Sequence, residues 1–438
     1  MSALGAPGFP ERAVRARARA GTAEVFPAAD AYGAELFGAG YAAGSGGAPG
    51  TPETPDALDA LRIVPPVFMP RRLEKLIDLG REPSYEDVAL DTPIGGFTAR
   101  LPLYLSAFGS TRAGSGDLGV AAGRQAARLG IPMVIGENMV PVHGYARGGD
   151  GGATRSALLE RIAAYAESLP DGVGGVVVQQ STEDADSEVW NLLYSDPGTR
   201  ALRDSGRLGF ELKVGQGAKP GLGGMTVVGA AEADRLAGQF AVRDLLGDAD
   251  DRRLRCATPG TFTEEIVRQQ LRFMRNNFPL ARTWVKFHPG RDIAQASATA
   301  WAAGADAVTV DGAEGGTGWA PRVFLDQVGL PLGECLRRIG SPGGDLLATG
   351  RIWEGGRAAR ALALGATAVG LGRAALLAVD EDPEAGLVRL VEALALELRL
   401  LVSALGKYSV TDLDPADLWS PDTPVAGAVA AVALGTPS

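Results

Sequence analysis

The sequence predicts an α/β protein, namely a (β/α)8 TIM barrel with a short N-terminal extension. From about residue 101 onward, eight short apolar segments alternate with helical patterns, and eight parallel strands are the number that closes such a barrel. Each apolar segment is nearly continuous, which is typical of strands buried on both faces of a parallel sheet. A doubly wound open sheet is the alternative.

The expected elements follow in order along the chain. Strands are expected at Leu103–Ala107, Pro132–Gly136, Gly175–Gln179, Phe210–Gly215, Trp284–Phe287, Ala307–Asp311, Leu346–Gly350 and Ala368–Gly372. Helices are expected at Leu118–Leu129, Ser156–Ser168, Glu264–Asn276, Ala294–Ala303 and Gly356–Leu364. About 45 residues separate Gly217 from Phe262, and a long loop after a barrel strand usually shapes the active site. A disordered surface insertion is the alternative interpretation of that loop.

Three parts are expected in the chain. Residues 1–63 are rich in Ala, Gly and Pro, with weak helical periodicity at Glu11–Ala20 and Ala29–Phe37; we interpret them as a loosely held arm or as a contact between copies in a homo-oligomer. Residues 64–420 form the barrel domain, which begins with a helix at Arg71–Leu79 and a short hairpin within Val88–Ala99. Residues 421–438 form a C-terminal tail.

The net charge and its distribution limit the classes of partner that the protein is expected to bind. The net charge is −10, and the one basic cluster, Arg12, Arg15, Arg17 and Arg19, is interpreted as part of a solvated arm. Nucleic acid needs a concentrated basic face, so we expect no nucleic-acid partner. A negative surface suits an enzyme with a small-molecule partner.

The cysteines and histidines are too few for a metal centre. Cys256 and Cys335 lie far apart in no CxxC spacing, and His143 and His288 are the only histidines. This excludes a disulfide scaffold, a thiolate zinc site and a cysteine cage for an iron–sulfur cluster. We expect no metal, no signal peptide, no membrane span, and a cytoplasmic location.

Two glycine loops that follow the last two predicted strands indicate a phosphate site. Glycine lets backbone N–H groups approach a ligand closely, and the loops after strands seven and eight of a barrel commonly bind phosphate. Here those loops contain Gly350 and Arg351, then Gly372 and Arg373. Arginine adds a planar cation that suits phosphate. The alternative is that glycine is simply common in this chain.

Other candidates lie at predicted strand ends. The segment Asp311–Gly318 reads DGAEGGTG and is long enough to wrap the polar tail of a flat ligand. Lys213 and Lys286 lie within apolar strands, where a cation needs a charged partner or a position at the barrel mouth. Lys286 therefore faces a ligand, or else forms a buried salt bridge. Glu137 ends the second strand and is interpreted either as ligand-facing or as a surface acid.

These residues resemble the FMN-binding (β/α)8 domain of glutamate synthase. The segment Lys213–Gly224, KVGQGAKPGLGG, is similar to that family's KIxQGAKPGEGG motif, and Asp311–Gly318 is similar to its GHDGGTGAS stretch. Ala348–Ile352 with Gly365–Arg373, Ser106–Gly109 and Leu405–Leu413 resemble further segments of the family. The resemblance spans roughly residues 64–420.

The resemblance implies a set of site residues. Ser106, Ala107 and Phe108 would pack on the FMN ring. The ring and ribityl chain would be held by Gln216, Lys286, Asp311, Gly315, Gly316, Thr317 and Gly318. The phosphate would be held by Gly350, Arg351, Gly370, Gly372 and Arg373. Lys219 and Glu137 would meet the carboxylate or amino group of the substrate, and Lys286 would stabilise negative charge on the reduced flavin.

The departures from the family change the expected function. Glu392–Leu405 holds no cysteine where the family has its iron–sulfur cysteines, and we expect no glutamine amidotransferase domain. The expected function is an FMN-dependent oxidoreductase acting on the CH–NH2 group of an amino-acid-like substrate, with an external electron donor or acceptor. The alternatives are a net-neutral FMN-dependent isomerase and a non-catalytic flavin- or ligand-binding subunit of a larger complex.

Overall fold

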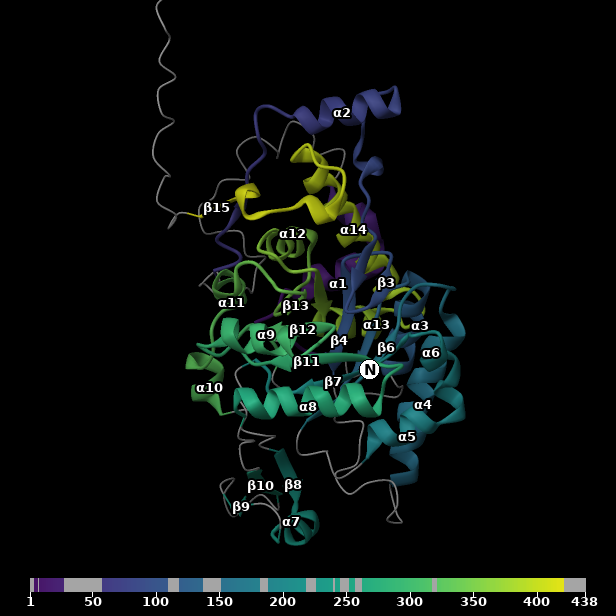
Figure 1. The fold of residues 1–438 in the computed structure, drawn as a ribbon, viewed down its shortest axis with the longest axis vertical. Coiled ribbons are helices and arrows are strands. Elements are labelled where there is room, and N and C mark those ends of the chain that lie inside the picture. Colours follow the sequence, from purple (N-terminus) through teal and green to yellow (C-terminus); the bar gives the residue numbers. More distant parts are fainter. Residues whose placement is uncertain are drawn as a thin grey trace, which may run out of the picture.

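A computed structural model shows a closed barrel of eight parallel strands (Figure 1). It describes residues 4–6, 8–26, 57–108, 118–136, 151–181, 188–217, 226–238, 241–244, 252–256, 262–316 and 321–420. The barrel strands are β4 (Leu103–Phe108), β5 (Met133–Ile135), β6 (Val176–Ser181), β7 (Leu208–Lys213), β11 (Arg282–Phe287), β12 (Ala307–Asp311), β13 (Asp345–Thr349) and β14 (Ala368–Leu371). Each pairs in parallel with the next, and β14 closes the ring on β4. The predicted barrel is confirmed, and the open sheet is wrong.

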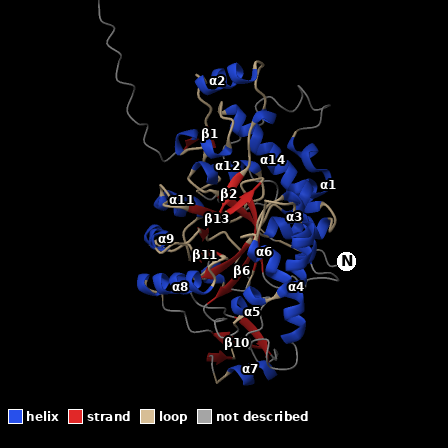
Figure 2. Cartoon of the chain, turned by 45° about the vertical axis from the view of Figure 1, so that its right-hand side comes forward, coloured by secondary structure: helices blue, strands red, loops and turns tan. Residues whose placement is uncertain are grey.

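Helices surround the strands (Figure 2). They are α3 (Leu118–Leu129), α4 (Gly151–Ser168), α5 (Val189–Ser195), α6 (Arg200–Asp204), α8 (Glu264–Asn277), α9 (Ile293–Ala302), α10 (Arg322–Gln327), α11 (Leu332–Ile339), α12 (Gly355–Ala363), α13 (Arg373–Glu381) and α14 (Gly386–Ala404). The start of α8 illustrates the local signals. The Thr263 hydroxyl caps the helix by accepting a hydrogen bond from the Ile266 N–H at 3.2 Å. Two glutamates in the first turn also stabilise the helix, because their negative charges lie near the positive end of its dipole.

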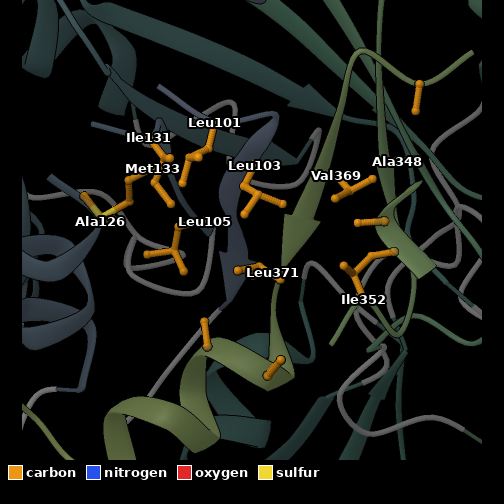
Figure 3. Packing of buried hydrophobic residues seen from close by; sticks show 14 of the residues in the cluster. Leu101, Leu103, Leu105, Ala126, Ile131, Met133, Ala348, Ile352, Val369 and Leu371 are labelled. Carbon is orange, nitrogen blue, oxygen red and sulfur yellow. The ribbon is translucent and has the colours of Figure 1, made fainter. Parts of the chain in front are cut away.

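The main core lies between the strands and the helices. On β4, Leu103 and Leu105 point outward, and the core also includes Met133 of β5 and Ala126 of α3 (Figure 3). Val369 and Leu371 of β14 lie in the same cluster. Because successive residues of a strand point to opposite faces, every second residue faces the inside of the barrel.

An apolar layer fills the amino-terminal part of the barrel interior. The hairpin of β2 (Thr92–Ile94) and β3 (Phe97–Ala99) contributes Ile94 and Phe97 to it, where they meet Tyr104, Trp284 and Leu347. The Trp284 indole N–H donates to the Gly95 carbonyl at 2.9 Å. Gly95 and Gly96 form the turn with φ of +54° and +87°, a conformation that glycine adopts without strain. The predicted hairpin is confirmed, and it closes this end of the barrel to water.

The long segment after β7 contains a small folded unit. It comprises β8 (Thr226–Gly229), α7 (Ala230–Leu236), β9 (Ala241–Arg243) and β10 (Arg252–Cys256), with β10 between the other two strands in an antiparallel sheet. Figure 1 shows this unit at the lower end of the view, beyond α8. The prediction of one long loop is therefore wrong for these residues. Charged residues such as Arg252 and Arg253 hid the strand pattern.

The N-terminal segment packs on the barrel helices. Helix α1 (Glu11–Ala20), followed by the 3-10 helix Gly21–Val25, buries Val14 and Ala18 completely. Arg15 bonds to Asp380 of α13 at 2.8 Å, and Arg17 bonds to Glu397 of α14 at 2.6 Å. The prediction that these two arginines belong to a solvated arm is therefore wrong, because carboxylates far along the chain pair with them. The predicted helix at Ala29–Phe37 lies outside the described residues.

The remaining elements are short or exposed. Helix α2 (Pro70–Leu79) has no buried residue, and β1 (Arg62–Ile63) pairs antiparallel with β15 (Leu418–Trp419). Single-turn 3-10 helices lie at Tyr85–Asp87, Pro197–Thr199, Val410–Asp412 and Pro415–Asp417. Within the described part of the chain, no helix is long and apolar enough to cross a membrane.

Candidate active site

Polar side chains replace apolar ones in the carboxyl-terminal half of the barrel interior. The residues that share this position are Ser106 of β4, Gln179 of β6, Glu211 of β7, Lys286 of β11, Thr309 and Asp311 of β12, and Thr349 of β13. All of them are buried. Catalytic residues of such barrels come from the carboxyl ends of several strands. We call this set the polar layer.

Glu211 is the centre of one half of the polar layer. Its carboxylate accepts from Gln179 Nε2 at 2.5 Å and from the Thr309 hydroxyl at 2.7 Å. Burial raises the pKa of Glu211, and the nearby Lys286 ammonium opposes that rise. A buried carboxyl group with both oxygens hydrogen-bonded is held in one orientation.

Lys286 and Asp311 form the other half. Their Nζ and Oδ2 atoms are 3.1 Å apart, and each side chain is 5% exposed. Asp311 also accepts a hydrogen bond from the backbone N–H of Gly217. Burial raises the pKa of Asp311, while Lys286 and then Lys213 oppose that rise. The QGAKPG motif is thereby tied at its first glycine to the end of β12.

The loops after β12 and β13 touch each other. The Gly312 N–H donates to the Thr349 carbonyl at 2.8 Å. Gly350 has a φ of +146°, and a Cβ placed on it would lie 3.3 Å from the Gly312 nitrogen. A side chain at position 350 would therefore be strained and would also push the two loops apart.

Two arginines converge beside these loops. Arg351 follows β13 in the left-handed region, with a φ of +56°, and its Nε is buried with no hydrogen-bond partner among the described residues. Arg373 is the first residue of α13, and burial followed by the nearby Arg351 guanidinium lowers its pKa. A Cβ on Gly316 would lie 3.7 Å from Arg373 Nη2, whereas beside Gly372 there is open space.

We call Arg351, Arg373, Gly316 and Gly372 the anion corner. The first N–H groups of a helix lack intrahelical partners, and the start of α13 therefore adds donors and a positive dipole end at the same place. Two close cations with an unpaired buried nitrogen need negative charge to offset their repulsion. The donor set of this corner fits a phosphate group.

The structure brings most of the predicted residues to this end of the barrel. Ser106 and Ala107 lie on β4, and Gln216 is half-buried just beyond β7. Gly315 packs close to Asp311, because a Cβ there would be 3.3 Å from Asp311 Cγ. Five predictions fall outside the described residues, namely Glu137, Lys219, Thr317, Gly318 and the side chain of Phe108.

The surroundings of Gly370 differ from those expected for a residue that binds phosphate. It points into the barrel, where a Cβ would lie 2.7 Å from the Tyr104 ring and would also overlap Thr349. Its missing side chain makes room for Tyr104. The predicted contact between Gly370 and phosphate is not supported by its surroundings, because Tyr104 and Thr349 fill the space beside it.

Three residues of the polar layer, Glu211, Gln179 and Thr309, were not predicted from the sequence. A signal was present, since Glu211 and Lys213 stand two residues apart in an apolar strand, as do Thr309 and Asp311. Such a spacing puts both side chains on one face of a strand. Among the described residues, no group of three or more His, Cys, Asp or Glu side chains could hold a metal ion.

These features define a class of protein, a closed (β/α)8 barrel with a buried ionic layer and an anion corner at the carboxyl ends of its strands. Residues 172–381 match the family model described as the conserved region in glutamate synthase. The resemblance to the glutamate synthase family is thereby confirmed. The matched region runs from just before β6 to the end of α13 and contains every residue of the polar layer except Ser106.

Curated relatives match the chain over part of their length. A glutamate synthase large subunit-like protein of Rhizobium meliloti (strain 1021) is 33% identical over 280 residues, which cover 61% of this chain and 60% of that protein. An archaeal glutamate synthase [NADPH] of Methanocaldococcus jannaschii is 31% identical over 183 residues, 39% of this chain and 34% of that protein. An isopentenyl-diphosphate delta-isomerase of Vibrio campbellii is 36% identical over 131 residues, 26% of this chain and 38% of that protein. The chain thus spans less than two thirds of these relatives.

Solved structures share the fold. An active chimera of (S)-mandelate dehydrogenase superposes with a TM-score of 0.53 at 18% identity, covering 83% of this chain and 88% of that one. A flavocytochrome b2 variant with bound sulfite gives 0.52 at 16% identity, covering 82% of this chain and 76% of that one. At such identities the likeness concerns the barrel architecture alone.

Proposed function

We propose that the barrel binds FMN at the carboxyl ends of its strands and that the protein is an FMN-dependent oxidoreductase. The observation that carries the proposal is the anion corner, where Arg351 and Arg373 converge at the start of α13 and Arg351 Nε has no partner among the described residues. Loops after the last two strands of a barrel commonly bind phosphate. The confirmed resemblance to the glutamate synthase family supports FMN as the phosphate-bearing group.

The polar layer lies where the flavin ring would meet the protein. FMN would supply the hydride-transfer centre. Lys286 would direct a positive charge toward the ring, and Asp311 fixes the Lys286 ammonium in place. The apolar layer of Tyr104, Trp284 and Leu347 excludes water that would enter from the amino-terminal end of the barrel. In such a dry site a fixed charge stabilises an opposite charge more strongly than it would in water.

The substrate we propose is amino-acid-like, with hydride transfer at a carbon that bears an amine or imine. The names of two relatives, which are glutamate synthases, support this class. Lys219 and Glu137 are proposed to contact the substrate carboxylate and amino group. Because the iron–sulfur cysteines expected from the family are missing from Glu392–Leu405, we propose that a diffusing electron donor or acceptor completes the reaction.

A net-neutral isomerase is the second candidate. It is favoured by one observation, the 36% identity to a protein named isopentenyl-diphosphate delta-isomerase over 131 residues. In that case substrate would be converted with no lasting change in the oxidation state of the flavin. The two candidates share the anion corner and differ in what the polar layer does.

An anaerobic titration distinguishes the candidates. The flavin-loaded protein is mixed with a panel of amino acids and, separately, with isopentenyl diphosphate, and visible absorbance and product are recorded. Bleaching of the flavin by an amino acid, in proportion to the oxidised product, supports the oxidoreductase. Product from isopentenyl diphosphate with an unbleached flavin supports the isomerase. No bleaching and no product with any substrate would contradict both.

A further inference from the structure

Arg357, a fully buried arginine of α12, joins three separate segments of the chain. Its Nη1 bonds to Asp59 at 2.7 Å and its Nη2 to Glu314 at 2.8 Å, while Nε and Nη2 donate to the Gly350 carbonyl at 3.2 and 3.1 Å. The Arg357 side chain is 0% exposed. Gly350 and Glu314 belong to the two loops that touch each other beside the anion corner. Asp59 comes from the segment that precedes the barrel.

Asp59 is itself held firmly against the barrel. Its neighbours Leu58 and Leu61 are almost completely buried, and a Cβ on Gly333 of α11 would lie 3.0 Å from the Leu58 nitrogen. Removing one partner from a buried ion pair leaves the other charge uncompensated. The position of the Gly350 loop therefore depends on a carboxylate supplied by the N-terminal segment.

A second contact links the N-terminal segment to the anion corner. The Phe9 ring lies 5.3 Å from Cζ of Arg373, and Phe9 is 6% exposed. Phe9 is fixed in turn, because its N–H donates to Ala6 and its carbonyl accepts from the Glu11 N–H at 2.7 Å. Helix α1 continues along α13, where Arg15 bonds to Asp380. An aromatic face orients a guanidinium without neutralising it, so Arg373 keeps its charge for an anion.

We propose that the described residues 4–6, 8–26 and 57–61 of the N-terminal segment form part of the flavin phosphate site. In this site Phe9 positions Arg373, and Asp59 positions Arg357 together with the loop that contains Gly350. Both are positioning residues, since neither side chain is proposed to touch the ligand. This inference rests on the proposed function. Its consequence is specific: the N-terminal segment strengthens binding of the phosphate group of FMN and not of the ring.

The test compares FMN with riboflavin, which has the ring and ribityl chain but no phosphate. Apoprotein of the full chain is titrated with each flavin, and binding is followed by quenching of flavin fluorescence. Phe9→Ala and Asp59→Asn are each expected to weaken FMN binding by roughly threefold to tenfold, as for the loss of one cation–π contact or one charged hydrogen bond. Riboflavin affinity is expected to stay unchanged.

Matched controls separate the inference from a general loss of structure. Phe26→Ala removes an aromatic ring that is 57% exposed in the same segment, and Asp78→Asn changes an exposed acid of α2; both should bind the two flavins as the parent protein does. The inference would be overturned if Phe9→Ala and Asp59→Asn weakened the binding of FMN and of riboflavin equally, or weakened the binding of neither flavin. A parent protein that binds neither flavin would instead reject the proposed function, and with it the inference.

Discussion

The Lys286 ammonium lies 3.1 Å from the Asp311 carboxylate inside the barrel, and each side chain is 5% exposed. The pair joins β11 to β12 at the depth where the apolar filling of the barrel gives way to polar residues. A buried pair of this kind is costly to form, and breaking it by removing one partner is more costly still. The same lysine therefore has a structural role and, in our proposal, a functional one.

Replacing Lys286 separates the two roles. Lys286→Met should lower the free energy of unfolding by about 3 kcal/mol near neutral pH, because Asp311 loses its ion-pair partner. The double change Lys286→Met with Asp311→Asn should regain most of that loss, since no buried charge of the pair remains. Urea unfolding measures both effects, and Lys75→Met on α2 is the control. Reduction of the bound flavin should stay impaired in the double variant, and full recovery of reduction would show that Lys286 acts only structurally.

Glu211 should make stability depend on pH in a defined direction. Burial raises its pKa in the folded state, so the folded protein holds this proton more tightly than the unfolded chain does. The stabilisation from that proton is complete below the ordinary glutamate pKa and is lost as the pH rises through the folded value. Glu211→Gln removes the titration. Its stability relative to the parent should therefore increase as the pH rises above the ordinary glutamate pKa. Urea unfolding at a series of pH values measures this, and a constant or decreasing difference would contradict it.

The anion corner should recognise phosphate. Arg351→Ala and Arg373→Ala are each expected to weaken FMN binding by about 10-fold to 100-fold, because a hydrogen bond to a charged group contributes about 1.5–3 kcal/mol. Riboflavin binding should change little. The control is Arg322→Ala at an exposed position of α10. Unchanged FMN affinity in both arginine variants would place the phosphate elsewhere.

Gly370 should matter for packing. Gly370→Ala places a methyl group 2.7 Å from the Tyr104 ring, and overpacking of this kind costs about 1–3 kcal/mol. Gly229→Ala is the matched control, since nothing lies within 4 Å of its Cβ position. Thermal unfolding of both variants provides the measurement. Equal melting temperatures of Gly370→Ala and the parent would mean that the barrel interior has more room than the structure indicates.

The barrel could be predicted from the sequence because each of its strands has a local sequence pattern. Each of the eight strands is an apolar run bounded by turn residues, and all eight predicted strands overlap the observed ones. Strands β8, β9 and β10 were not predicted, because all three are short and because arginines interrupt the apolar pattern of β9 and β10. Their pairing is decided by contacts between strands, such as Leu254 of β10 opposite Val227 of β8.

The candidate site was predictable only in part. Three members of the anion corner, Arg351, Gly372 and Arg373, were predicted from the glycines and arginines that follow the last two strands. Arg357 could not be foreseen, because its partners Asp59, Glu314 and Gly350 lie far apart in the sequence and meet only in the folded chain. The packing of α1 on α13 has the same cause, since Arg15 pairs with Asp380 and Glu381, which are 365 and 366 residues away.

The visible absorption spectrum of the purified protein, with the released chromophore identified by mass, tests the central claim most directly. We predict a flavin spectrum and stoichiometric FMN, either as purified or after incubation with FMN. A colourless protein that does not take up added FMN would contradict the assignment of the anion corner to flavin phosphate, and with it the proposed oxidoreductase.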